Sequence, residues 1–249
     1  MKRIVTSFLT LLFILSIVAM LPATAQAAKV KLDKTKMVVE LGTKDAQLMV
    51  KNTDAQVKWS TSDKKVVKVN KKGMLTPVSV GLAKVTAKVN GKKYTCKVTV
   101  VDYSGMSVEQ KEVVSFALQY VGNKYCYGGT SLTKGTDCSG FTMSVYKEFG
   151  YNLAHNAYSQ LKSVKSVKMK NIKPGDLIFY GYSKSSCSHV ALYIGNQKVV
   201  HASNEITGIT ISDYNYRKYV GVGRVLKKAT YPQQDDNVQD DNITRTAAK

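Results

Sequence analysis

A nearly perfect alternation of polar and apolar residues along positions 93–100 is the strongest constraint on how this chain folds. The two sets fall on opposite faces: Tyr94, Cys96, Val98 and Val100 against Lys93, Thr95, Lys97 and Thr99. Successive side chains of a strand point to opposite sides, so this segment predicts a strand with one buried and one solvent face. Similar short runs separated by turn signals such as Asn90-Gly91 extend back to Val30. Roughly seven such strands predict a small all-β sandwich.

The same region carries a family resemblance. Trp59-Ser60-Thr61-Ser62 is followed by Gly73 and, eight residues later, by Gly81. Over residues 29–102 this pattern resembles a bacterial group 2 immunoglobulin-like domain, which implies an immunoglobulin-like sandwich. The shared positions are core and turn positions and carry no chemistry. Adhesion or positioning on a cell wall is one role for such a domain; a spacer or weak-binder role is the one we favour.

A second pattern begins at residue 107 and predicts another domain, over residues 107–228. Ser107 and Gln110 have the spacing of a capping box at the start of a helix. Apolar residues then recur at helical spacing: Val113, Val114, Ala117, Leu118 and Val121. Beyond this domain, residues 229–249 contain four aspartates and almost no large apolar residues, which predicts a disordered acidic tail.

The first 27 residues have the organisation of a secretory signal peptide. Lys2 and Arg3 precede an apolar run of 18 residues, Ile4 to Leu21, and small residues follow around Ala25. An uncleaved anchor is the alternative, because about 20 apolar residues span a bilayer. We expect cleavage, and therefore a secreted or wall-associated protein with no stable membrane span. The net charge of +20 favours anionic wall polymers as partners, and export makes nucleic acid an unexpected one.

Cys138 is a candidate nucleophile because of its place at the start of a predicted helix. A glycine-containing loop leads into the residue, and Phe141, Val145 and Phe149 then recur every four positions before Gly150. Unpaired N–H groups and the helix dipole stabilise a thiolate at such a position, which lowers the pKa of a thiol. By itself the segment fits a buried structural cysteine equally well.

His189 and His201 lie on two short runs that predict an antiparallel hairpin closed at Asn196-Gln197. Neighbouring strands would hold the two imidazoles close together. A thiol nucleophile needs an imidazole within hydrogen-bond reach, and that base works better when a third group fixes its tautomer. A histidine in a strand is, on its own, more often structural than catalytic.

Five blocks, taken together and in order, resemble the NlpC/P60 family of cell-wall cysteine peptidases over residues 108–226. The blocks are Tyr125-Cys126-Tyr127-Gly128-Gly129, Asp137-Cys138-Ser139-Gly140-Phe141, 173–179, 189–195 and His201-Ala202. The resemblance implies a papain-like α+β fold in which Cys138 attacks a peptide carbonyl, His189 acts as general base and acid, and His201 orients His189. It also implies that Tyr125 lines the site and that Asp137 and Ser139 bind the amino end of the substrate.

Two features depart from the family pattern or leave alternatives open. Where the family often has Leu-Pro-Arg, this chain has Leu153-Ala154-His155; His155 either substitutes for the arginine or, as we expect, is a surface residue. A disulfide between Cys126 and Cys187, or a metal site that includes His189, is conceivable, but neither has a familiar spacing. We expect neither a metal nor another cofactor.

The sequence therefore predicts a secreted peptidoglycan hydrolase. By resemblance, the bond cleaved is the one between D-γ-glutamate and the following diamino acid of the stem peptide. Two alternatives stay open: a wall-binding, adhesin-like protein with a weak or inactive hydrolase domain, and a thiol amidase or acyltransferase that acts on another substrate.

Overall fold

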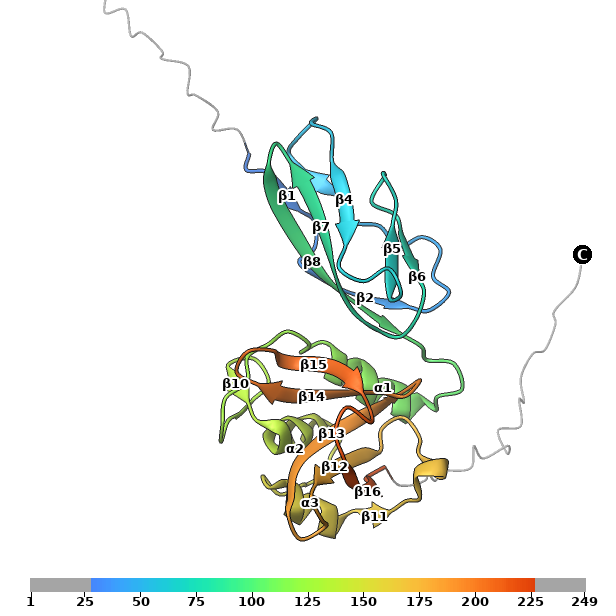
Figure 1. Cartoon of the computed structure of the whole chain (residues 1–249), viewed down its shortest axis with the longest axis vertical. Helices are drawn as coiled ribbons and strands as arrows, with labels where there is room; N and C mark the ends of the chain where they lie inside the picture. The colour runs from blue at the N-terminus through green and yellow to red at the C-terminus, as the bar shows by residue number, and fades with distance from the viewer. Residues whose placement is uncertain (1–27, 227–249) are drawn as a thin grey trace, which may run out of the picture.

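The computed structural model describes residues 28–226, which form an amino-terminal and a carboxy-terminal unit (Figure 1). The predicted signal peptide, residues 1–27, and the predicted acidic tail, residues 229–249, lie outside the described residues. Between residues 28 and 226, none of the helices has the length and apolar character needed to cross a membrane.

The amino-terminal unit is rich in strands, and no helix occurs between residues 28 and 102. Its strands are β1 (Lys31–Leu32), β2 (Lys36–Glu40), β3 (Val50–Lys51), β4 (Lys58–Thr61), β5 (Val67–Val69), β6 (Leu75–Pro77), β7 (Gly81–Val89) and β8 (Lys92–Val101). β2, β8, β7 and β4 form one sheet in that order, while β1 pairs with β3 and β5 with β6. The strand content agrees with the sequence, and the immunoglobulin-like assignment stays a prediction.

The alternation in β8 accounts for the position of this unit's core. Cys96, Val98 and Val100 are fully buried, as predicted. Asn90 and Gly91 both have positive φ, the geometry of a tight hairpin turn between β7 and β8. Thr99 was predicted to face solvent and is buried instead, because residues that follow helix α1 (Val108–Leu118) lie beside this end of the sheet.

The carboxy-terminal unit packs helices against an antiparallel sheet, which confirms the predicted α+β class. Besides α1 its elements are β9 (Thr130–Ser131), β10 (Gly135–Thr136), α2 (Cys138–Glu148), α3 (Ala157–Ser163), β11 (Lys165–Ser166), a 3-10 helix (Met169–Asn171), β12 (Leu177–Gly181), β13 (Cys187–Gly195), β14 (Lys198–Asn204), β15 (Gly208–Asp213) and β16 (Tyr219–Arg224). The sheet order is β11-β16-β12-β13-β14-β15. One large core joins α1 and α2 to β12, β13 and β14.

Local signals in the sequence fix the ends of the elements that carry the site. The capping box of α1 is present: Gln110 N–H donates to Ser107 Oγ, and Ser107 N–H donates to Gln110 Oε1. The hairpin of β13 and β14 closes at Asn196 and Gln197, both with positive φ, as predicted. Helix α2 begins at Cys138 and ends before Gly150, which also agrees with the sequence.

Gly73 offers a test of packing in the amino-terminal unit. Its φ is +79°, and an added Cβ would lie 2.3 Å from Leu48 O and 2.8 Å from Trp59 Cζ2. We expect Gly73→Ala to lower the free energy of unfolding of this unit by about 3 kcal/mol or more, because backbone strain and a clash combine. Denaturant unfolding followed by the fluorescence of Trp59, the chain's single tryptophan, measures this.

Gly91 is the matched control for that substitution. Its φ is +80°, yet an added Cβ would meet nothing within 4 Å. Gly91→Ala should therefore cost only the strain of the left-handed conformation, about 1 kcal/mol. Equal losses in the two variants would contradict the packing described here.

Candidate active site

The carboxylate of Asp137 fixes the loop and helix that present Cys138. Asp137 Oδ1 accepts from Gly140 N–H at 2.7 Å and so caps the first turn of α2. The same oxygen accepts from Ser139 Oγ at 3.0 Å, and Oδ2 accepts from Gly128 N–H at 3.0 Å. One buried carboxylate therefore joins the helix to the glycine-containing loop, and it holds Cys138 at the first position of α2.

His155 contacts the same carboxylate. Its Nε2 lies 3.0 Å and 2.9 Å from the two oxygens of Asp137, although the residue itself is exposed. His155 is a surface residue, as expected, and its ring is also held by a charged partner. This contact agrees with the alternative, in which His155 substitutes for the family's arginine.

Burial governs the acidity of the Cys138 thiol. The side chain is buried beneath the site surface, and this desolvation raises its pKa above the ordinary value. Backbone N–H groups of Val190, Ser139 and Cys138 itself act in the opposite direction and do not compensate. The helix start was expected to lower the pKa of this thiol, and that expectation is wrong because removal from water outweighs the backbone N–H groups directed to the sulfur.

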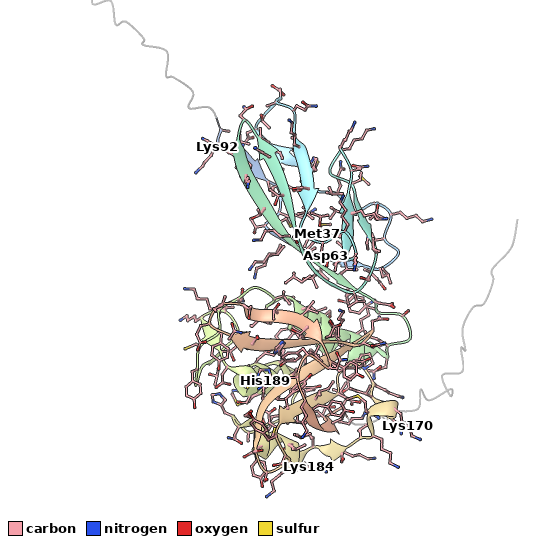
Figure 2. All side chains as sticks on the ribbon, viewed as in Figure 1. Met37, Asp63, Lys92, Lys170, Lys184 and His189 are labelled. Carbon is pink, nitrogen blue, oxygen red and sulfur yellow. The ribbon has the colours of Figure 1, made fainter. Side chains whose placement is uncertain are left out.

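The thiol lies beside the strand that carries His189. Helix α2 packs against β13, and the N–H of Val190, the residue after His189, is directed to the sulfur. His189 is buried, and Figure 2 labels it near the middle of the carboxy-terminal unit in that view. The nucleophile candidate and the imidazole candidate are therefore neighbours in space although 51 positions separate them in the sequence.

His189 and His201 are joined directly by their rings. His189 Nε2 lies 2.8 Å from His201 Nδ1, with the two rings perpendicular. Both side chains are buried. Desolvation, together with the charge of Arg217, lowers the pKa of His201 to about 4, and desolvation and the neighbouring His201 lower the pKa of His189 well below its ordinary value. Both imidazoles are therefore neutral at neutral pH.

Two further residues, which the sequence did not reveal, fix the tautomer of His201. Its Nε2 lies 3.0 Å from Ser212 Oγ, and Tyr216 OH lies 3.3 Å from its Nδ1. Burial raises the pKa of Tyr216 to about 12, so this hydroxyl keeps its proton and can donate to Nδ1. A neutral imidazole has one donor and one acceptor nitrogen. We therefore assign Nε2 of His201 as the donor to Ser212 and Nδ1 as the acceptor, whose one lone pair is shared between His189 Nε2–H at 2.8 Å and the longer contact with Tyr216 at 3.3 Å.

The assignment leaves His189 with a free lone pair. Since His189 Nε2–H donates to His201, its Nδ1 is unprotonated and can accept a proton. The chain of contacts from His189 through His201 to Ser212 is the geometry of an oriented base. A signal for Ser212 existed in the strand pattern, because Thr210 pairs with His201 and Ser212 is on the same face two residues later.

Tyr125, Asp137 and Ser139 gather around the thiol. Tyr125 is bridged to Thr136 of β10, directly before Asp137. Burial, then the charges of Cys138 and Asp137, raise the pKa of the Tyr125 hydroxyl. All six predicted site residues therefore converge on one region, although the roles assigned to them stay predictions.

Gln160 was not predicted and is fully buried beside the site. Its amide donates to Ser139 O at 3.0 Å and to Ala154 O at 2.7 Å, and its oxygen accepts from Thr142 Oγ1 at 2.8 Å. Gln160 thereby ties α3 to the first turn of α2. It supports the position of the helix that carries Cys138.

The four cysteines carry free thiols, so Cys126 and Cys187 are not joined in this structure. Cys126 is exposed next to Tyr125, and Cys187 is buried at the start of β13. Among the side chains described between residues 28 and 226, no three potential ligands are grouped as a metal site.

Comparison with known proteins assigns this region to a family. Residues 122–224 match the NlpC/P60 family and are an NlpC/P60 domain. The gamma-D-glutamyl-L-lysine dipeptidyl-peptidase of Bacillus subtilis (strain 168) is 31% identical over 135 residues, which is 52% of this chain and 45% of that protein. The murein DD-endopeptidase MepS/murein LD-carboxypeptidase of Escherichia coli (strain K12) is 39% identical over 113 residues, 43% of this chain and 58% of that protein.

The chain thus spans about half the length of these two curated relatives. Among solved structures, the NlpC/p60 domain of the peptidoglycan hydrolase SagA is 27% identical with a TM-score of 0.44, covering 47% of this chain and 100% of that one.

The lowered pKa values predict acid sensitivity. Between pH 6.5 and pH 4 the unfolded chain binds a proton at residue 201 that folded His201 excludes, so the free energy of unfolding falls as the pH falls. His201 alone should account for about 3 kcal/mol of this loss, and His189 adds to it. Urea unfolding at several pH values, followed by far-UV circular dichroism, measures the loss.

His201→Gln should remove that share of the pH dependence, whereas His155→Gln, at an exposed ring, should not. The same pH dependence in the parent and in His201→Gln would contradict a neutral, buried His201.

Proposed function

We propose that this protein is a peptidoglycan hydrolase that cuts an amide bond of the stem peptide, with Cys138 as nucleophile and His189 as general base and acid. The observation that carries the proposal is the buried thiol at the start of α2, beside β13 and an imidazole chain that ends at Ser212. Residues 122–224, which contain these side chains, are an NlpC/P60 domain. Relatives of this chain are named as enzymes that cleave murein or γ-D-glutamyl bonds.

The resting pair of Cys138 and His189 is neutral, because burial raises the pKa of the thiol and lowers that of the imidazole. The proton therefore moves from Sγ to His189 Nδ1 as the sulfur attacks the carbonyl carbon. His189 then protonates the leaving amine when the C–N bond breaks, which leaves an acyl group on Cys138. Water, deprotonated by His189, hydrolyses this thioester and restores the thiol.

His201 stabilises the intermediate charge in this cycle. When His189 becomes an imidazolium ion, its Nε2–H still donates to His201 Nδ1, and His201 still donates to Ser212. No tautomer has to change during the reaction. The developing oxyanion can accept from backbone N–H groups at the start of α2, where Cys138 and Ser139 have theirs.

We infer that the bond cleaved lies between D-γ-glutamate and the diamino acid. The first-named relative acts on γ-D-glutamyl-L-lysine, and a free amino end two residues before the bond would bring a cation near Asp137. The Asp137 carboxylate already accepts four partners, about the number it can hold. The substrate's amine would therefore take the place of His155, the exposed one among these partners.

The predicted signal peptide and the charge of +20 support action outside the cell, on an anionic wall. The amino-terminal unit would then help to hold the enzyme on that polymer. We propose a secreted or wall-associated location on these grounds.

Cys138→Ala should lower the release of soluble fragments from purified peptidoglycan at least about a thousandfold, because the nucleophile is lost. Mass spectrometry of the fragments also names the bond. Cys126→Ala is the matched control, since this exposed thiol has no role in the mechanism, and it should retain full activity. If Cys138→Ala releases fragments as fast as the parent, the mechanism is wrong; if neither releases any from walls of several stem-peptide types, a wall-binding role gains support.

Ser212→Ala should lower kcat about tenfold with little change in KM, because His201 loses the acceptor that fixes its tautomer. Ser212→Thr keeps the hydroxyl and should restore most of the rate. Ser203→Ala, near the end of the neighbouring strand β14, is the control. Steady-state kinetics on a defined muropeptide distinguishes these variants, and an unchanged kcat in Ser212→Ala would exclude Ser212 from the proton chain.

A further inference from the structure

The two units of the chain share a continuous apolar contact. Val80 and Val101 of the amino-terminal unit belong to the same buried cluster as Val113, Val114 and Ala117 of α1. Strand β7 also contacts β15 of the other unit. Figure 1 shows the end of the amino-terminal sheet facing α1 and β15. The amino-terminal unit is therefore packed onto the domain that holds the site.

Two lysines of the amino-terminal unit extend across this contact. Lys97 Nζ donates to Gly122 O at 3.3 Å, and Lys36 Nζ donates to Asn123 Oδ1 at 2.7 Å. Lys36 and Lys97 are direct partners in the register of β2 and β8. A Cβ on Gly122 would lie 2.4 Å from Lys97 Nζ, and the φ of Gly122 is +85°, so glycine favours this close approach.

The position of this lysine pair has an electrostatic reason. Segment 119–123 continues from the carboxyl end of α1, where the helix dipole places partial negative charge, although the N–H groups of residues 119–121 already donate to the carbonyls of residues 116–118. Helix α1 has no basic residue in its own last turn. Lys36 and Lys97 of the other unit place positive charge on the segment just beyond this end, at Gly122 and Asn123. Burial, and then the charge of the neighbouring Lys97, lowers the pKa of Lys36.

The segment that the lysines hold leads directly to the site. Gly122 N–H donates to Ile209 O at 2.7 Å, and Ile209 N–H donates to Asn123 O at 2.9 Å, which ties the segment to β15. Cys126 N–H donates to Thr136 O at 3.0 Å, just before Asp137. A path of direct contacts therefore runs from the lysine pair through 122–126, the segment with Tyr125, to the loop that presents Cys138.

We propose that Lys36 and Lys97 are positioning residues for the active site, so that the amino-terminal unit is a structural part of the catalytic centre as well as an attachment to the wall. The proposal rests on the proposed function for its effect on catalysis. Its effect on the site's structure is independent of that function.

The test compares two matched pairs of cross-strand lysines in the full chain. Lys36→Met with Lys97→Met removes the two ammonium groups and keeps most of the aliphatic stems. Lys88→Met with Lys93→Met does the same to a directly paired couple at the far end of β7 and β8, and it serves as the control. Lys36→Met alone changes an exposed residue and provides a variant that folds if the double substitution does not.

Three measurements are made well below the unfolding temperature. Hydrogen exchange with mass spectrometry should show about tenfold faster exchange over residues 119–136 in the Lys36/Lys97 variant, with the peptides of β12 unchanged. Iodoacetamide alkylation of Cys138, followed by peptide mapping to separate it from exposed Cys126, should be about tenfold faster, because a loosened loop uncovers the thiol. On a defined muropeptide, kcat should fall about tenfold. Lys36→Met alone should show a smaller effect of the same kind.

Unchanged exchange and alkylation in the Lys36/Lys97 variant would overturn the proposal, as would equal effects in the Lys88/Lys93 control. If the parent is active and the Lys36/Lys97 variant shows altered exchange but the same kcat as the parent, the positioning role is also overturned. If the parent cleaves no peptidoglycan, the proposed function fails, and exchange and alkylation still decide whether the lysines hold the site.

Discussion

The arrangement of this site depends on the contacts that the carboxylate of Asp137 makes. This carboxylate caps α2, binds the glycine-containing loop through Gly128 and receives the ring of His155. A capping carboxylate is favourable at a helix start because the orphan N–H groups there need acceptors. Here the cap also determines where the first residue of the helix, Cys138, meets β13. Removal of this carboxylate would release three parts of the site at once: the loop, the start of the helix and the residues proposed to bind the amine of the substrate.

Burial then decides the chemistry that the site can perform. The thiol of Cys138 and the imidazoles of His189 and His201 are all withdrawn from water, so each keeps its neutral form. In such a site Cys138 is a neutral thiol, not a thiolate, before it attacks the substrate. The rate then depends on an imidazole chain with fixed tautomers, and Ser212 and Tyr216 are the groups that fix them. The same burial makes the fold sensitive to acid, so stability and catalysis have a common physical origin.

Much of this could be predicted from the sequence, and the exceptions have physical reasons. The alternation of polar and apolar residues predicted which face of β8 is buried, and the capping box predicted the start of α1. Asn196-Gln197 predicted the turn of the hairpin that carries the two histidines. Short sequence patterns predict local structure, but they do not predict contacts between segments that are far apart in the sequence. The burial of Thr99, the contact of His155 with Asp137, and the bonds of Ser212 and Lys97 all depend on tertiary packing. The acidity of Cys138 was misjudged because the dipole of a helix can be read from a sequence and the depth of a side chain cannot.

The central claim is that Cys138 and His189 rest as a neutral pair and exchange a proton only during attack. The pH dependence of Cys138 alkylation, followed site by site through peptide mapping, tests this claim most directly. A neutral pair predicts that the rate still rises at pH 9, since burial raises the thiol's pKa above its ordinary value of 9.0. A rate that reaches its plateau below neutral pH would reveal a thiolate and imidazolium pair already formed at rest, and would contradict the account.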